Sequence, residues 1–366
     1  MNRRAVFHIG IDKTGSKTVQ NTFYGARELL FSKERILYPS VSVNLSVPLA
    51  VAFQDVSPTT LRPIKSPLVD ESSLKRTRWN FRAALEADLD RDNWSTVLLS
   101  AESLCDFGPE EVARFTDWLG GYTTDVRVVA YVRHPVDWTR SSLQQHVKGG
   151  RSLEYLYENP PVPNWRRRFT PWLEAFGRER FTLVSFNDAI RTDGIVASFC
   201  DAAGLPRERV LPLAPEAPVN ESMSHEAVLL LDSLNRQRPL MRDGKLSPER
   251  LWRGTGTIKK IPGGKFRLSS RHQVRAREKS RPDLAWLNET FSVNLYPDVF
   301  DDSTQAEAAA PQEISQETID ALARLISDYG NRVKRLGEEG AGFKAAKPPE
   351  RPNIIARVFA RLRSRR

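Results

Sequence analysis

Short apolar runs alternate with segments of helical periodicity along the first two-thirds of the chain. The apolar runs have the length of strands and cover residues 5–7, 36–39, 96–100, 126–132 and 181–186. Between and after them, helical spacing predicts helices at 19–30, 76–91, 109–119, 135–148, 165–176, 194–203 and 224–235. Continuous apolar strands that alternate with helices are typical of a parallel sheet covered on both faces. The pattern therefore predicts an α/β fold with a P-loop-like parallel β-sheet flanked by helices.

Two of the predicted helices carry aromatic residues on their apolar side. In the helix at 76–91, we expect Trp79, Leu85 and Leu89 to form the buried side. The helix at 165–176 has aromatic residues at helical spacing, namely Trp165, Phe169, Trp172 and Phe176. Such a stripe indicates a core contact more often than a saccharide platform.

Some segments fall outside this alternation. Residues 40–75 are rich in Ser, Pro, Val and Thr, and residues 236–310 contain a glycine-rich basic stretch at 253–265, so we expect irregular insertions near both. A further helix is predicted at 311–336. After residue 337 come a proline-rich linker at 347–352 and an amphipathic arginine-rich segment at 354–366. We therefore expect one domain over residues 1–336, followed by a basic linker and amphipathic tail at 337–366.

Composition limits the classes of function. The chain has 366 residues, of which 40% are hydrophobic, and no run approaches the ~20 apolar residues of a membrane-spanning helix. Its 2 cysteines are too few for a disulfide framework, which fits the cytoplasm. The net charge of +10 indicates an anionic ligand, a nucleic acid or a membrane surface. The tail at 354–366 suits peripheral binding at the inner, anionic membrane face, or is a frayed basic terminus.

The first loop, residues 8–18, is predicted to bind phosphate. It joins the first strand to the first helix, and helix N-termini have unpaired N–H groups and partial positive charge. Gly15 permits close approach of an anion, and Lys13 and Lys17 add charge. The spacing of Gly10 and Gly15 is that of a Walker A loop, but Ser16 intervenes before Lys17 and Thr18. An ordinary surface turn is the alternative.

Three polar features follow the carboxyl ends of neighbouring strands. These are the first loop, Glu102 after the strand at 96–100, and Arg133 after the strand at 126–132. In open parallel sheets, ligands bind outside these ends. Ser141 lies two turns beyond Arg133 on the next helix, where it can reach an anion that Arg133 also contacts. The sequence therefore predicts that these groups surround one anionic ligand.

These residues resemble the motifs of one enzyme family. Residues 8–20 look like the 5′-phosphosulfate loop of sulfotransferases that use 3′-phosphoadenosine 5′-phosphosulfate (PAPS), and residues 129–135 followed by Ser141 look like their 3′-phosphate motif. Weaker similarity to bacterial carbohydrate-type members occurs at 98–103, 181–186 and 220–224, so the resemblance covers roughly residues 6–235. Asp12 stands where proline is common and Lys17 where a small hydroxyl residue is common. The Asp12 carboxylate is expected to oppose anion binding.

The resemblance implies transfer of a sulfuryl group from PAPS to an acceptor hydroxyl, by in-line displacement and without a metal. The implied catalytic residues are Lys13, at the leaving phosphate, and Glu102, the general base. The implied nucleotide-binding residues are Lys13, Thr14, Gly15, Ser16, Lys17, Thr18, Arg133 and Ser141. Two alternative roles for Glu102 are to cap the following turn and to pair with a nearby lysine. His8, His134 and His146 are rival bases, although His8 is expected to be packed or hydrogen-bonded locally.

The implied partners are PAPS and a carbohydrate or glycolipid acceptor, with an anionic membrane surface as a partner of the tail. One alternative is a P-loop kinase that phosphorylates a small molecule with ATP and Mg²⁺, but its Walker B-type aspartate is missing from the strand ending in Ser100, Ala101 and Glu102. The other is a nucleic-acid-binding module. Interleaved aromatic and basic residues on one element are not evident, so no nucleic-acid partner is expected.

Overall fold

The computed structural model describes residues 3–55, 71–216, 222–237, 239–242, 245–247 and 255–301, with isolated positions between 317 and 329. The chain forms two compact units. The first consists of Met1–Ser222 with Arg267–Ala309, and the second of Met223–Phe266 with Ala310–Arg366. Every candidate site residue belongs to the first unit.

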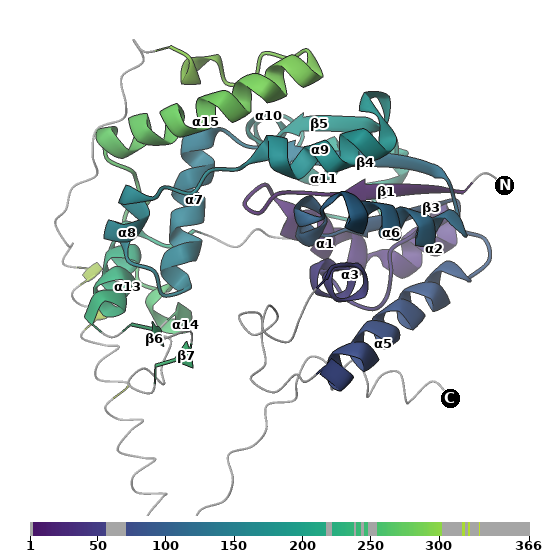
Figure 1. The fold of residues 1–366 in the computed structure, drawn as a ribbon, viewed down its shortest axis with the longest axis horizontal. Coiled ribbons are helices and arrows are strands. Elements are labelled where there is room, and N and C mark those ends of the chain that lie inside the picture. The colour runs from purple at the N-terminus through teal and green to yellow at the C-terminus, as the bar shows by residue number, and fades with distance from the viewer. Residues whose placement is uncertain are drawn as a thin grey trace, which may run out of the picture. The chain divides into compact units, whose positions relative to one another are not determined.

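The first unit is built on a five-stranded parallel sheet in the order β2-β3-β1-β4-β5 (Figure 1). Its strands are β1 (Arg4–His8), β2 (Ile36–Leu37), β3 (Thr96–Ser100), β4 (Asp125–Val132) and β5 (Phe181–Ser185). The residue His8 at the end of β1 pairs with Ser100 of β3 and Val129 of β4. The predicted α/β fold with a parallel sheet is confirmed, and the loops that follow β1, β3 and β4 leave the same edge of the sheet.

Helices cover both faces of this sheet. They are α1 (Ser16–Gly25), α2 (Arg27–Glu34), α3 (Ser46–Phe53), α5 (Glu71–Leu89), α6 (Pro109–Gly120), α7 (Pro135–Lys148), α8 (Leu153–Glu158), α9 (Trp165–Phe176), α10 (Phe186–Arg191), α11 (Ile195–Ala203), α12 (Arg207–Val210) and α15 (Ser270–Phe291). The described residues of this unit also form the 3₁₀ turns η1 (Glu102–Asp106), η2 (Arg178–Arg180) and η3 (Pro297–Val299). In Figure 1, α15 crosses the upper end of α7, and it contacts both α7 and α9.

Adjacent residues of β1 show how the two faces are filled, because successive strand side chains point to opposite sides. Phe7 packs against Phe115 of α6 and Trp172 of α9, with ring centroids 5.0 and 5.5 Å apart. His8 faces the other side and lies 5.3 Å from the Phe199 ring of α11. The aromatic residues predicted on the helix at 165–176 are therefore core residues, as expected.

Several predicted elements differ from the structure. The helix expected at 19–30 is two helices, α1 and α2, that meet at Ala26, directly after the poor helix former Gly25. Residues 40–75 are not irregular throughout, because they contain α3 and the first turn of α5. Leu85 and Leu89 of α5 are buried as predicted, but Trp79 is 70% exposed. The insertion expected at 236–310 contains the long helix α15.

The second unit contains α13 (His225–Gln237), α14 (Thr255–Ile258) and a hairpin of β6 (Met241–Arg242) and β7 (Lys245–Leu246). The backbone N–H of His225 donates to the carbonyl of Gly264, which joins the start of α13 to the glycine-rich segment. The predicted helix at 311–336 lies mostly, and the tail at 337–366 entirely, outside the described residues. None of the helices described for this chain has the length and apolar character needed to cross a membrane.

Candidate active site

The loop between β1 and α1 has the geometry of an anion-binding turn. Lys13 and Gly15 have positive φ angles of 68° and 86°. A side chain at Gly15 would be strained by this φ and would place its Cβ 3.2 Å from the Phe186 ring. The Thr14 hydroxyl donates to the Ile11 carbonyl at 2.6 Å and braces the turn. Within the described residues, no side chain caps the start of α1, so its first N–H groups remain suited to an anion.

The β4–α7 junction holds this loop from the other side. The Arg133 guanidinium donates from Nη1 to the Lys13 carbonyl at 2.9 Å. The Trp138 indole N–H donates to the Asp12 carbonyl, also at 2.9 Å. Lys13 Nζ donates to Gln145 Oε1 at 3.1 Å, so the loop side chain also reaches α7. The two predicted phosphate-binding segments are thus in direct contact.

A cavity of about 510 Å³ opens at this contact. Most of the predicted site residues line it, namely Lys13, Gly15, Ser16, Lys17, Thr18, Glu102, Arg133 and Ser141. Thr14 does not, because its side chain is fully buried beneath the loop. Other residues that line the cavity were not predicted, and they include Asn21 of α1 and Gln144, Gln145 and Lys148 of α7. The last three follow Ser141 at helical spacing, which is the sequence signal that would have identified them.

Burial affects both basic groups that bridge the two segments. It lowers the pKa of Lys13, an effect that the nearby Asp12 and Glu102 carboxylates oppose. It also lowers the pKa of Arg133, which Asp137 opposes. Arg133 Nε is buried and has no hydrogen-bond partner in the part of the chain that the structure describes. A bound anion close to both groups would offset the cost of burying their charges.

Glu102 is the first residue of η1, directly after β3 and Ala101. Its backbone N–H donates to the Ser46 hydroxyl of α3 at 2.8 Å, and Ser103 N–H donates to the same oxygen at 3.3 Å. Among the described residues, the Glu102 carboxylate neither caps the following turn nor pairs with a lysine. Burial raises its pKa and Asp12 adds to the effect, whereas Lys13, Lys17 and Arg168 lower it. A carboxylate with this environment is suited to accept a proton in the cavity.

The rival bases do not line this cavity. His8 is buried, its Nδ1 lies 2.8 Å from the Ser100 hydroxyl, and burial lowers its pKa to about 3, so it is neutral and locally packed as expected. His134 Nε2 lies 2.9 Å from Asp298 Oδ2. Burial also lowers the pKa of His146. Glu216 does line the cavity, but its carboxylate accepts the backbone N–H of Val196 at 3.3 Å.

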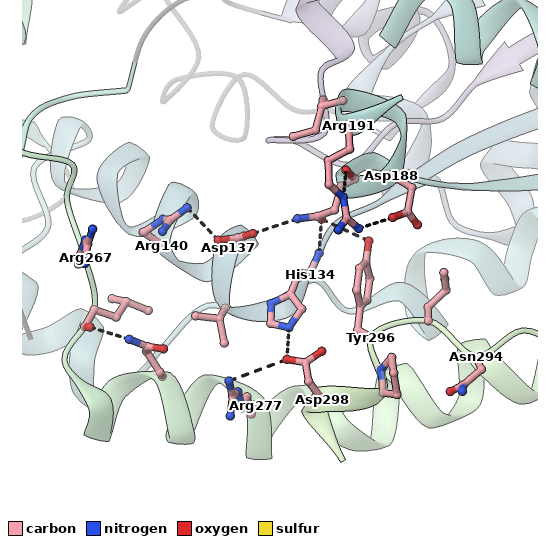
Figure 2. A pocket seen from close by; sticks show the side chains of 17 residues that line it. His134, Asp137, Arg140, Asp188, Arg191, Arg267, Arg277, Asn294, Tyr296 and Asp298 are labelled. Carbon is pink, nitrogen blue, oxygen red and sulfur yellow. Dashed lines mark hydrogen bonds and ion pairs between the residues drawn. The ribbon is translucent and has the colours of Figure 1, made fainter. Parts of the chain in front are cut away.

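Figure 2 shows a second cavity of about 600 Å³, next to the β4–α7 junction. Here Asn187 Oδ1 accepts the backbone N–H of His134 at 2.9 Å, and Asn187 Nδ2 donates to Asp137 at 3.0 Å. The Tyr296 hydroxyl donates to the Val132 carbonyl at 3.0 Å. These bonds fix the main chain immediately before and after Arg133, so this polar cluster positions the arginine that lines the first cavity.

The carboxylates of this second cavity are already paired with arginines. Asp137 lies 2.8 Å from Arg140, and Asp188 contacts Arg191. Asp298 lies 3.8 Å from Arg277 as well as close to His134 (Figure 2). The charges that line this second cavity therefore largely compensate one another within the chain.

Comparison with known proteins gives distant structural likeness only. No family model and no curated protein matches this chain. A solved sulfotransferase from Alicyclobacillus acidocaldarius is 14% identical, with a TM-score of 0.45, over 82% of this chain and 100% of that one. A sulfotransferase domain from the curacin biosynthetic pathway is 13% identical, with a TM-score of 0.32, over 71% of this chain and 99% of that one. The function must therefore be argued from the residues of the cavity.

Proposed function

We propose that this chain is a sulfotransferase that uses PAPS as its sulfuryl donor. One observation carries the proposal. The anion-binding loop, the pair Arg133 and Ser141, and the carboxylate of Glu102 all line a single cavity. Two separate anion-binding groups suit a nucleotide with phosphate at both its 5′ and 3′ positions, and the carboxylate suits an acceptor that must lose a proton.

The residues fit such a ligand. The uncapped start of α1 and the Lys13 ammonium would hold the 5′-phosphosulfate end, with Gly15 leaving room for the anion. Arg133 and Ser141 would hold the 3′-phosphate, since both line the cavity and a guanidinium can bond two phosphate oxygens at once. The cavity of about 510 Å³ lies within the ~300–1,000 Å³ usual for small ligands.

When bound, PAPS supplies a sulfuryl group whose bond to the 5′-phosphate breaks as a bond from sulfur to the acceptor oxygen forms. Glu102 accepts the proton of the attacking hydroxyl, in keeping with its raised pKa and free carboxylate. Lys13 stabilises the negative charge that develops on the leaving phosphate. Besides holding the 3′-phosphate, Arg133 donates a hydrogen bond to the Lys13 carbonyl and so fixes the loop that binds the 5′-phosphosulfate end.

The acceptor in this proposal is a hydroxyl of a carbohydrate or glycolipid, as the similarity to carbohydrate-type motifs suggests. Basic residues at 354–366 would bring the enzyme to an anionic membrane surface that carries such an acceptor. Sedimentation with anionic liposomes tests the second idea. A variant lacking residues 351–366 should stay in solution, and equal sedimentation of both proteins would contradict it.

Transfer of ³⁵S-sulfate from labelled PAPS tests the enzymatic function. We expect labelled product from at least one member of a panel of saccharides, glycolipids and phenols, and about a hundredfold less, or lower still, from a Glu102→Gln variant. Label transfer to none of the panel, with phosphate transfer from ATP and Mg²⁺ to a small molecule instead, would favour the kinase. Tight binding of single-stranded DNA, with no transfer of either group, would favour a nucleic-acid-binding module.

A further inference from the structure

Asp12 places a carboxylate in the loop that is proposed to bind an anion. It precedes Lys13, is only partly buried, and raises the pKa of Glu102, so its charge is felt inside the cavity. A carboxylate at this place would repel a phosphosulfate group, because like charges close together in a partly desolvated site are destabilising.

The Asp12 carboxylate has one recorded ionic partner among the described residues, Arg168. Arg168 Nη1 lies 3.8 Å from Asp12 Oδ1, and Arg168 Nε lies 3.3 Å from Asp106 Oδ1 in η1. Arg168 comes from the first turn of α9 and does not line the cavity. Its guanidinium therefore reaches Asp12 without forming part of the cavity wall.

Arg168 is largely removed from water, and its Nε and Nη1 make no hydrogen bond among the described residues, so its contacts with Asp106 and Asp12 are ionic. Only 16% of its side chain is exposed. The start of α9 is fixed by Asp283 of α15, whose carboxylate accepts the backbone N–H groups of Trp165 and Arg166. Because the guanidinium is mostly shielded from solvent, its charge is screened less than that of an exposed ion pair, and it lies 3.8 Å from the Asp12 carboxylate.

We infer that Arg168 is a positioning residue of the anion site, which neutralises Asp12 so that Asp12 does not repel the bound anion. This inference rests on the proposal that the loop binds the 5′-phosphosulfate end of the nucleotide. It also explains how the chain carries an acidic residue where the resembled family commonly has proline.

A double-mutant cycle with Arg168→Met and Asp12→Asn tests the inference. The readout is the dissociation constant of adenosine 3′,5′-bisphosphate, measured by calorimetry. We expect R168M to weaken binding about tenfold, which corresponds to ~1.4 kcal/mol. D12N should bind at least as tightly as the parent chain. The double variant should bind within about threefold of the parent, because the amide that D12N introduces carries no charge to neutralise.

Arg167→Met is the matched control. Arg167 lies one residue earlier on α9 and pairs with the same Asp106 oxygen at 3.1 Å, but among the described residues it has no recorded contact with Asp12. R167M should therefore leave bisphosphate binding unchanged. Melting temperatures without ligand identify any variant that is merely unstable, and a purely structural role for Arg168 would not be rescued by D12N.

The inference is overturned if R168M binds the bisphosphate like the parent chain, or if the double variant binds as weakly as R168M. If the parent chain does not bind the bisphosphate, the proposed function fails, and inorganic pyrophosphate becomes the probe for the loop. The same tenfold loss and rescue with pyrophosphate would uphold the role of Arg168. If R168M binds pyrophosphate as tightly as the parent chain and D12N has no effect on R168M, the role of Arg168 is overturned.

Discussion

Replacing Arg133 by methionine removes two contacts at once, and two nucleotide ligands tell them apart. The Arg133 guanidinium donates to the Lys13 carbonyl at 2.9 Å and so fixes the phosphate loop. In the proposed complex, it also holds the 3′-phosphate together with Ser141. Arg133→Met keeps most of the aliphatic volume and removes the charge and all donors, so both contacts are lost together.

The free energies of these two contacts can be compared by measuring how tightly two nucleotides bind. A hydrogen bond that involves a charged group contributes ~1.5–3 kcal/mol, which is roughly a 10- to 150-fold change in affinity. Loss of the tether to Lys13 should weaken binding of any 5′-phosphate equally. Loss of the 3′-phosphate contact should weaken adenosine 3′,5′-bisphosphate alone. We therefore expect R133M to reduce the preference for the bisphosphate over adenosine 5′-monophosphate by about 10- to 150-fold.

Calorimetric titration of both nucleotides with both proteins is the assay. Arg140→Met is the matched control, because Arg140 lies on the same helix but pairs with Asp137 and does not line the loop cavity. It should change both affinities by the same factor. If R133M weakens the two nucleotides equally, Arg133 only tethers the loop, and the assignment of the 3′-phosphate to Arg133 is wrong.

Other predictions concern Glu102 and His8. Glu102→Gln should lower kcat by ~10²–10⁴-fold with little change in bisphosphate affinity, and full activity with the best acceptor would reject Glu102 as the base. Because burial raises the pKa of Glu102, kcat of the parent enzyme should increase with pH around a pKa above the ordinary carboxyl range. The residual kcat of Glu102→Gln should not show this increase. If both enzymes show the same increase of kcat with pH, Glu102 is not the base. The pKa of His8 is lowered from 6.5 to about 3, so the folded state binds fewer protons than the unfolded state between these values, and stability is lost as pH falls below 6.5. Urea unfolding should show that His8→Asn reduces this pH dependence by up to ~1.4 kcal/mol per pH unit, and an unchanged slope would contradict the reasoning.

The order of the main elements could be predicted because it depends on local signals. The apolar runs of β1, β3 and β4 are buried in the sheet, and Gly15 carries the positive φ that the first loop needs. Ligands bind outside the carboxyl ends of parallel strands, and this rule predicted that the loop, Glu102 and Arg133 lie close together. Their shared cavity follows from topology and needs no knowledge of long-range packing.

Helix α3 could not be predicted from periodicity. Its residues from Pro48 to Phe53 are all buried, so no alternation of apolar and polar positions marks it as a helix. Pro48 falls in its first turn, where the missing N–H costs nothing. The contact of Ser46 with the backbone of Glu102 could not be predicted for a different reason, because it joins residues 56 positions apart.

Helix α15 did carry a signal that composition concealed. Its buried residues follow helical spacing, but Gln273, Ala276 and Ser280 occupy the first half of the stripe, so only Leu284, Leu287 and Phe291 read as apolar. Arg168 shows a different limit. Helical spacing assigns no partner to Arg168, and only the packing of α9 brings it to Asp12.

The central claim is that the cavity holds a nucleotide with phosphate groups at both its 5′ and 3′ positions. Thermal unfolding of the full chain with adenosine 3′,5′-bisphosphate, ATP with Mg²⁺, or single-stranded DNA tests it most directly. The account predicts a rise in melting temperature of several degrees with the bisphosphate, and a much smaller rise with the other two ligands. Stabilisation by ATP with Mg²⁺ or by DNA, without stabilisation by the bisphosphate, would contradict it.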